Sequence, residues 1–165
     1  QPGNGSEFRV LFPALAAGTA GAAEAKAETK ADRGRPALDG RVLLAEDEPM
    51  VAEFMREILE SWGLEVAAAA DGASALSLFE ADPDGFDLVL SDQTMPRLTG
   101  IELARALAAR KPGLPILLYT GLADGLTPER LTAAGVRAAL SKPVDPAELL
   151  ALLRAHLPAP ARASA

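Results

Sequence analysis

Five short apolar runs alternate with five helical patterns along most of the chain. The runs lie at 42–45, 65–69, 86–90, 115–119 and 136–140, and the helical patterns at 51–62, 73–81, 101–109, 128–134 and 146–157. Most of the runs are continuously apolar, which is typical of strands that are covered on both faces of a sheet. Regular alternation of strand and helix indicates parallel strands joined by right-handed crossovers. The pattern therefore predicts an α/β fold with a doubly wound parallel sheet of (βα)5 form.

Residues that begin and end helices support these boundaries. Gly63 follows the first helical pattern, in the place of a C-terminal glycine. Thr127 precedes the fourth pattern and Asp145 precedes the fifth, and both residue types are favoured N-caps. Pro146 then takes the first position of the last helix, where proline is tolerated best.

The composition narrows the kinds of site and partner that the chain can have. It contains no cysteine and one histidine, His156, which excludes thiolate and multi-histidine metal sites. A net charge of −7 argues against a large nucleic-acid footprint, so no nucleic-acid partner is expected. No apolar run approaches 18 residues and no signal peptide is recognisable, so this segment is expected to have no membrane contact and to be cytoplasmic.

Polar side chains follow the predicted strands at the points where the strands end. They are Glu46 and Asp47 after the first strand, Asp92 after the third, Thr120 after the fourth and Lys142 after the fifth. Ligands of open α/β sheets bind outside the carboxyl ends of the strands. These five side chains are therefore expected to meet at one edge of the sheet.

Such a cluster needs a cation, because two carboxylates about 4 Å apart repel by roughly 4 kcal/mol at an effective dielectric constant near 20. Oxygen ligands without histidine or cysteine suit Mg²⁺, which leaves coordination positions open for phosphate oxygens. Lys142 could neutralise one phosphate oxygen and Thr120 could donate a hydrogen bond to another. A carboxylate can accept a phosphoryl group as an aspartyl phosphate, and Asp92 on the third strand is the candidate nucleophile.

Each of these residues also has an ordinary structural explanation when it is taken alone. An acidic pair such as Glu46-Asp47 is usually solvated or lies at a helix N-terminus. A single aspartate before a loop is usually a cap or turn residue. The hypothesis of a phosphoryl-accepting site depends on the agreement of four strand ends in their order and chemistry.

These residues closely resemble the receiver domain of two-component response regulators. The matching motifs are Glu46-Asp47, Asp92 in SDQTMPRLTG, Thr120 in YTG and Lys142-Pro143 in SKP. The resemblance covers residues 40–157 and is specific in order and spacing. It implies a flavodoxin-like fold with strand order 2-1-3-4-5.

The resemblance also implies a role for each residue of the site. Asp92 would be the phosphoacceptor, while Thr120 would move toward the phosphoryl group and Lys142 would pair with it. The Lys142–Pro143 peptide bond would be cis. A receiver of this kind has autophosphatase capacity at most, whereas its parent protein would be a histidine kinase. The implied Mg²⁺ ligands are Asp47, Asp92 and the backbone carbonyl of Thr94, with Glu46 acting through water.

One position departs from the family pattern. Family members usually carry an aromatic residue three positions before the lysine, and Ala139 occupies that place here. The usual coupling between the threonine and an aromatic side chain is therefore in doubt. Tyr119, directly before Thr120, is a candidate substitute.

The N-terminal residues carry a second resemblance. GNGSEFRVLFP, within residues 1–13, is similar to the last strand of a sensor histidine kinase ATP-binding domain, with a chance Gly-rich hairpin as the alternative. Residues 14–39 are rich in alanine and poor in large apolar residues, which predicts a flexible linker. Residues 158–165 are expected to be a disordered tail. This organisation is that of a bacterial hybrid histidine kinase that ends in a receiver.

Two functions follow from these observations. The first is phosphorelay signalling, in which Asp92 accepts a phosphoryl group from a histidine kinase in the same polypeptide or exchanges it with a histidine phosphotransfer protein. The second is a receiver-like interaction module that binds its partner independently of phosphorylation, which the Ala139 substitution would suit. The complete set of acidic, hydroxyl and cationic residues favours the first.

Overall fold

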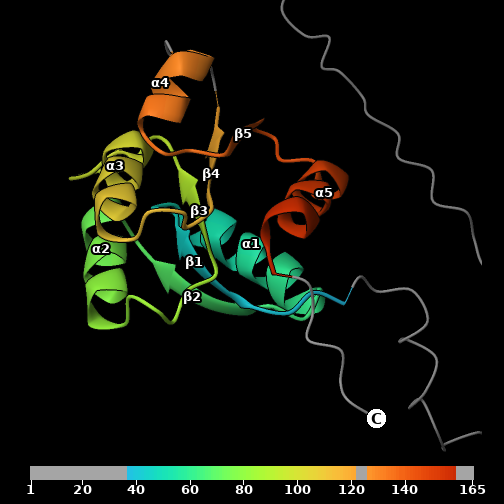
Figure 1. The fold of residues 1–165 in the computed structure, drawn as a ribbon. Coiled ribbons are helices and arrows are strands. Elements are labelled where there is room, and N and C mark those ends of the chain that lie inside the picture. The colour runs from blue at the N-terminus through green and yellow to red at the C-terminus, as the bar shows by residue number, and fades with distance from the viewer. Residues whose placement is uncertain (1–36, 122–125, 159–165) are drawn as a thin grey trace, which may run out of the picture. The chain divides into compact units, whose positions relative to one another are not determined.

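Five parallel strands form the centre of the fold in the order β2-β1-β3-β4-β5 (Figure 1). The strands are β1 (Arg41–Ala45), β2 (Glu65–Ala69), β3 (Leu88–Asp92), β4 (Ile116–Thr120) and β5 (Ala138–Ser141). The predicted parallel sheet and its order are thus confirmed. This computed structural model describes residues 37–121 and 126–158. The predicted kinase strand at 1–13, nearly all of the predicted linker and the tail beyond Pro158 lie outside the described residues.

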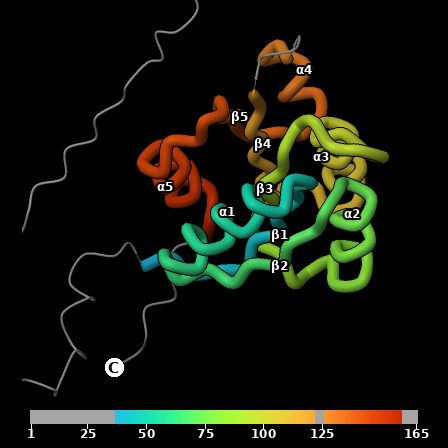
Figure 2. The backbone as a smooth tube through the Cα atoms, turned by 180° about the vertical axis from the view of Figure 1, so that it is seen from behind, coloured from blue at the N-terminus to red at the C-terminus, as the bar shows by residue number. Residues whose placement is uncertain are grey.

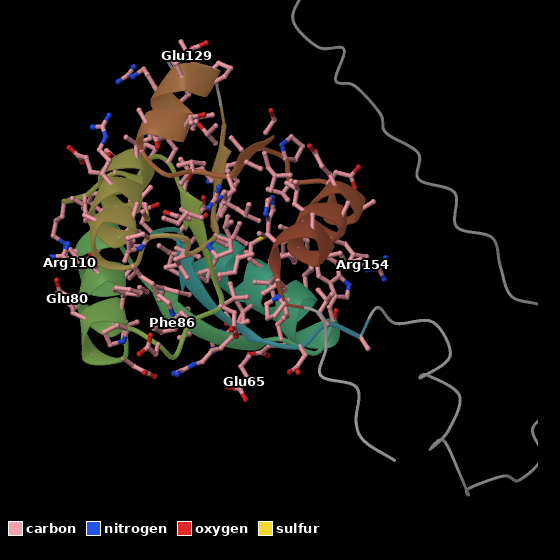
Figure 3. All side chains as sticks on the ribbon, in the orientation of Figure 1. Glu65, Glu80, Phe86, Arg110, Glu129 and Arg154 are labelled. Carbon is pink, nitrogen blue, oxygen red and sulfur yellow. The ribbon has the colours of Figure 1, made fainter. Side chains whose placement is uncertain are left out.

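Helices cover both faces of the sheet. They are α1 (Pro49–Ser61), α2 (Gly72–Ala81), α3 (Gly100–Arg110), α4 (Pro128–Ala133) and α5 (Pro146–His156). Buried residues of α2 and α3 pack on one face, and buried residues of α1 and α5 pack on the other. In both views α2 and α3 lie side by side (Figures 1 and 2). Near their C-terminal ends, the two helices are joined by an ion pair of 2.7 Å between Glu80 and Arg110, which Figure 3 labels.

The fourth strand shows how the sheet divides the core. Successive side chains of a strand point to opposite faces. Ile116 and Leu118 belong to the cluster under α2 and α3, whereas Leu117 and Tyr119 belong to the cluster under α1 and α5. All four are fully buried. Both faces of the sheet are therefore apolar, which explains why the sequence shows continuous apolar runs.

Two strands, β3 and β5, begin two residues later than the sequence predicts. Phe86 is apolar but precedes β3, where its ring stacks on Phe79 with the ring centroids 6.5 Å apart. Val136 precedes β5, and its backbone N–H donates to the Leu131 carbonyl oxygen of α4. Both residues are buried by packing against a helix instead of by strand pairing, so an apolar pattern alone could not distinguish them from strand residues.

The predicted caps are present, and the structure adds others. Thr127 and Asp145 accept hydrogen bonds from the backbone N–H groups of Arg130 and Ala147. Gly63 has a φ of +96°, a conformation that glycine adopts without strain. At the start of α3, Thr99 and Glu102 form a reciprocal capping box that was not predicted. None of the helices within residues 37–121 and 126–158 has the length and apolar character that crossing a bilayer requires.

Candidate functional site

The carboxyl ends of four adjacent strands bring the predicted site residues to one edge of the sheet. Asp92 and Thr120 are the last residues of β3 and β4, Glu46 and Asp47 follow β1, and Lys142 follows β5. The strand register aligns Ala45 with Ser91, Asp92 with Tyr119 and Thr120 with Ser141, so the chain leaves these strands at about the same level.

Three carboxylates form a compact acidic cluster at this edge. One oxygen each from Glu46, Asp47 and Asp92 lies within 4.8 Å of the others. Glu46 and Asp92 are buried and Asp47 is exposed. At that spacing each pair repels by roughly 3–4 kcal/mol at an effective dielectric constant near 20. A set of three oxygen donors without nitrogen or sulfur fits a hard divalent cation such as Mg²⁺.

Lys142 supplies a positive charge inside the cluster. Its Nζ donates to Asp92 Oδ2 at 2.9 Å and to Glu46 Oε2 at 3.4 Å. Burial alone would lower the pKa of Lys142, but the hydrogen bond to Asp92 and the charges of Asp92 and Glu46 outweigh burial and raise this pKa. The ammonium is therefore charged at neutral pH. One ammonium among three carboxylates leaves a net charge of −2 for a divalent cation to balance.

Glu46 is held by two further donors. Its Oε1 accepts the backbone N–H of Glu48 at 3.0 Å, and its Oε2 accepts the hydroxyl of Tyr119 at 2.9 Å. Tyr119 is fully buried. Burial and the nearby charge of Glu46 raise the pKa of Tyr119 far above its usual range, so the hydroxyl remains a protonated donor.

From the sequence, Tyr119 is a candidate only as a replacement for the aromatic side chain that is missing at Ala139. The structure places the two residues on opposite faces of the sheet. Tyr119 packs toward α1 and α5, whereas Ala139 is exposed and alternates with Leu140, which belongs to the α1 and α5 cluster. Tyr119 therefore does not fill the position that Ala139 leaves open. The missed signal was the odd-even alternation along β4.

The loop after Asp92 is fixed at several points. A Cβ atom on Gly100 would overlap the carbonyl oxygen of Asp92, so only glycine lets α3 begin this close to β3. The Gly100 N–H donates to the carbonyl oxygen of Gln93 at 3.0 Å. Arg97, in a positive-φ conformation, pairs with the buried Asp71 at the N-cap of α2. The Arg97–Asp71 pair joins two loops and was not predicted.

The remaining predicted residues, Thr94 and Thr120, are more exposed than Glu46 and Asp92. Thr94 is exposed in the loop two residues after Asp92, and its role as a carbonyl ligand stays a prediction. Thr120 is half-buried at the end of β4. A Cβ atom on the neighbouring Gly121 would meet no atom of the described residues within 4 Å. The Lys142–Pro143 peptide bond is cis, as predicted.

An apolar hollow of about 360 Å³ adjoins the site between α1 and the loop from β5 to α5. It is lined by Val51, Phe54, Met55, Tyr119, Lys142, Pro143, Val144 and Pro146. Phe54 is 54% exposed, and Met50 on the same helix is 82% exposed. Lys142 thus contacts both the acidic cluster and an apolar surface.

The fold and the site together define a doubly wound α/β domain with an acidic pocket at the carboxyl edge of its sheet. The model of the response regulator receiver domain matches residues 42–154, and the chain belongs to this family. It is therefore a receiver domain of two-component signalling.

Relatives and solved structures agree with this assignment. The chain is 40% identical over 119 residues to the response regulator MprA of Mycolicibacterium vanbaalenii, a match covering 71% of this chain and 50% of the relative. It is 31% identical over 138 residues to the peroxide stress-activated histidine kinase mak3 of Schizosaccharomyces pombe, covering 80% of this chain and 6% of that protein. The structure of chemotaxis protein CheY4 of Vibrio cholerae aligns with a TM-score of 0.65 at 31% identity, covering 73% of this chain and all of that one.

The curated relatives are longer than the matched region. The DNA-binding response regulator MtrA of Mycolicibacterium smegmatis is 35% identical over 118 residues, covering 71% of this chain and 50% of that protein. The chain thus spans about half the length of the response regulators it matches, and a much smaller part of the kinase mak3.

Proposed function

We propose that Asp92 accepts a phosphoryl group from a phosphohistidine in a reaction that depends on Mg²⁺. One observation carries the proposal: the buried Asp92 carboxylate lies within 4.8 Å of two other carboxylates and 2.9 Å from the Lys142 ammonium. A structural aspartate would gain nothing from two like charges at this distance. An acceptor for a metal-bound phosphoryl group needs them.

Each residue then has a defined task. Asp47, Asp92 and the Thr94 carbonyl would hold Mg²⁺, with Glu46 acting through water, and the ion would balance charge on the phosphoryl oxygens. A carboxylate oxygen of Asp92 attacks phosphorus as the bond from phosphorus to the imidazole nitrogen of the donor breaks. Lys142 pairs with one phosphoryl oxygen and the Thr120 hydroxyl donates to another. With a proton on the other ring nitrogen of the donor, the imidazole leaves as a neutral histidine, and the other product is an aspartyl phosphate. Alignment and charge balance therefore supply most of the catalysis.

A protein donor must also dock beside Asp92. The exposed apolar side chains of Met50 and Phe54 lie on α1, next to the hollow that reaches Lys142. Exposed large apolar groups beside a polar site are typical of surfaces that bind another protein. We assign this surface to the domain that carries the phosphohistidine.

The parent protein in this proposal is a bacterial hybrid histidine kinase in which the receiver follows the kinase domain and lies in the cytoplasm. The support comes from the kinase-like sequence at residues 1–13 and from the similarity to the histidine kinase mak3. The donor would be the phosphohistidine domain of the same polypeptide, and a histidine phosphotransfer protein could exchange the phosphoryl group. The sequence that precedes Gln1 tests this organisation, because a kinase domain with its histidine is expected there.

Phosphorylation-independent binding is the second candidate, and the exposed Ala139 in place of an aromatic side chain favours it. Acetyl phosphate with Mg²⁺, followed by intact-mass measurement, separates the two. Wild type is expected to gain the mass of one phosphoryl group and Asp92→Asn none. Asp84→Asn, at a fully exposed aspartate before β3, serves as the matched control and should label like wild type. A wild type that is never labelled would favour the binding module, and labelling of Asp92→Asn would move the acceptor elsewhere.

A further inference from the structure

We propose that Tyr119 is a positioning residue that sets how the Lys142 ammonium is shared between Glu46 and Asp92. Its hydroxyl holds the Glu46 carboxylate, and its ring lies beside the Lys142 ammonium. The catalytic meaning of this arrangement rests on the function proposed above. The contacts themselves belong to the folded domain and can be tested without phosphorylation.

Both partners of the hydrogen bond between the Tyr119 hydroxyl and Glu46 are buried. Tyr119 is fully buried and Glu46 is 2% exposed, so water cannot replace the hydrogen bond of 2.9 Å between them. A buried polar group without a partner is costly. The second oxygen of Glu46 accepts the Glu48 N–H, so turning the carboxylate would break this hydrogen bond as well as the one from Tyr119. Glu46 is therefore fixed in one orientation.

The ring contact concerns the lysine. Lys142 Nζ lies 5.0 Å from the centre of the Tyr119 ring, within the range of a cation–π interaction. The same nitrogen is 2.9 Å from Asp92 Oδ2 and 3.4 Å from Glu46 Oε2. Glu46 Oε2 thus has two donors, the Tyr119 hydroxyl and Lys142. Without the hydroxyl, Lys142 would be the remaining donor to this oxygen among the described residues, and the ammonium would move toward Glu46 and away from Asp92.

The test compares two substitutions that separate the effect of the Tyr119 hydroxyl from the effect of its ring. Tyr119→Phe removes the hydroxyl and keeps the ring, and Tyr119→Leu removes both. Loss of a partner that orients metal ligands typically weakens metal binding by about 10-fold or more. Mg²⁺ affinity, measured by calorimetry on metal-free protein, is therefore expected to fall about 10-fold in Tyr119→Phe and further in Tyr119→Leu.

Two matched variants separate positioning from general stability. Leu117→Ala alters the same strand and the same face at another fully buried side chain, and should leave Mg²⁺ affinity unchanged even where it lowers stability. In a Glu46→Gln background, Tyr119→Phe is expected to add no further loss, because the hydroxyl acts through that carboxylate. Equal affinity in Tyr119→Phe and wild type would overturn the inference, and so would an undiminished loss in the Glu46→Gln background.

A spectroscopic measurement on the unaltered protein supplements these variants. Tyr119 is the single tyrosine of the chain, so its hydroxyl proton gives one assignable resonance. A slowly exchanging, downfield hydroxyl signal is expected in metal-free protein, and a rapidly exchanging hydroxyl would contradict the inference. Labelling by acetyl phosphate keeps the two proposals apart. An unlabelled wild type removes the proposed phosphorylation and leaves the Tyr119 result standing, whereas labelling with unchanged Mg²⁺ affinity in Tyr119→Phe removes only the role of Tyr119.

Discussion

Asp92 is buried next to carboxylates that repel its negative charge and an ammonium that attracts it. Two carboxylates lie within 4.8 Å of it, and the Lys142 ammonium lies 2.9 Å away. With no divalent cation bound, the Lys142 ammonium pairs with both buried carboxylates of the cluster, Asp92 and Glu46. A buried carboxylate that loses its partner is strongly destabilising, because its charge is left uncompensated. The lysine therefore stabilises the metal-free domain in addition to its proposed role with phosphate.

We predict that Lys142→Ala lowers the free energy of unfolding of the metal-free domain by about 2 kcal/mol. The estimate lies below the range for fully buried pairs because the lysine side chain is 29% exposed. Urea unfolding in the presence of a chelator measures the change. Adding Asp92→Asn to this variant removes one carboxylate and should restore part of the lost stability. A double variant as unstable as the sum of both single losses would show that Lys142 and Asp92 are not coupled.

At the scale of elements, helix α1 borders the site and carries two large apolar side chains that are exposed. Met50 and Phe54 are apolar and exposed on α1, close to the hollow beside Lys142. Leu78 on α2 is also exposed, at 40%, but its helix packs on the other face of the sheet. The two helices therefore offer a matched pair of apolar surface residues, one beside the site and one on the far layer.

We predict that Phe54→Ala slows phosphoryl transfer from a protein donor at least several-fold. Truncating a central apolar interface residue commonly costs more than 1 kcal/mol of binding free energy. Labelling by acetyl phosphate should be unchanged, since a small donor does not need the α1 surface. Leu78→Ala is the control and should behave like wild type with both donors. Equal slowing with acetyl phosphate would mean that Phe54 acts on the site itself and not on docking.

The sequence predicted the elements better than the contacts between them. Continuous apolar runs and helical periodicity identified all ten elements of the described domain, because burial on two faces leaves a pattern along the chain. The Tyr119–Glu46 hydrogen bond and the Arg97–Asp71 pair join residues 73 and 26 positions apart. No local pattern records such contacts, since they depend on register and on loop conformation. The late start of β3 at Leu88 was missed because Phe86 is as apolar as a strand residue.

At the scale of the whole molecule, the chain has a net charge of −7, and three of its negative charges lie together at one edge of the sheet. Excess like charge destabilises the compact state through self-repulsion. A divalent cation bound at this edge relieves that repulsion only in the folded domain, because the carboxylates of Glu46, Asp47 and Asp92 come together only there. Folding and metal binding are therefore expected to be linked.

We predict that Mg²⁺ stabilises the folded domain against thermal unfolding. A ligand that binds only the native state at ten times its dissociation constant adds about 1.4 kcal/mol, which is roughly 5 °C in Tm for a domain of this size. Differential scanning calorimetry of chelator-treated protein, with and without Mg²⁺ at matched ionic strength, measures the shift. Asp47→Asn should lose most of it because a proposed ligand loses its charge, while the exposed control Asp84→Asn should keep it. The same rise in Asp47→Asn as in wild type would mean that Mg²⁺ acts by screening the net charge of the chain, and the assignment of Asp47 as a ligand would then fail.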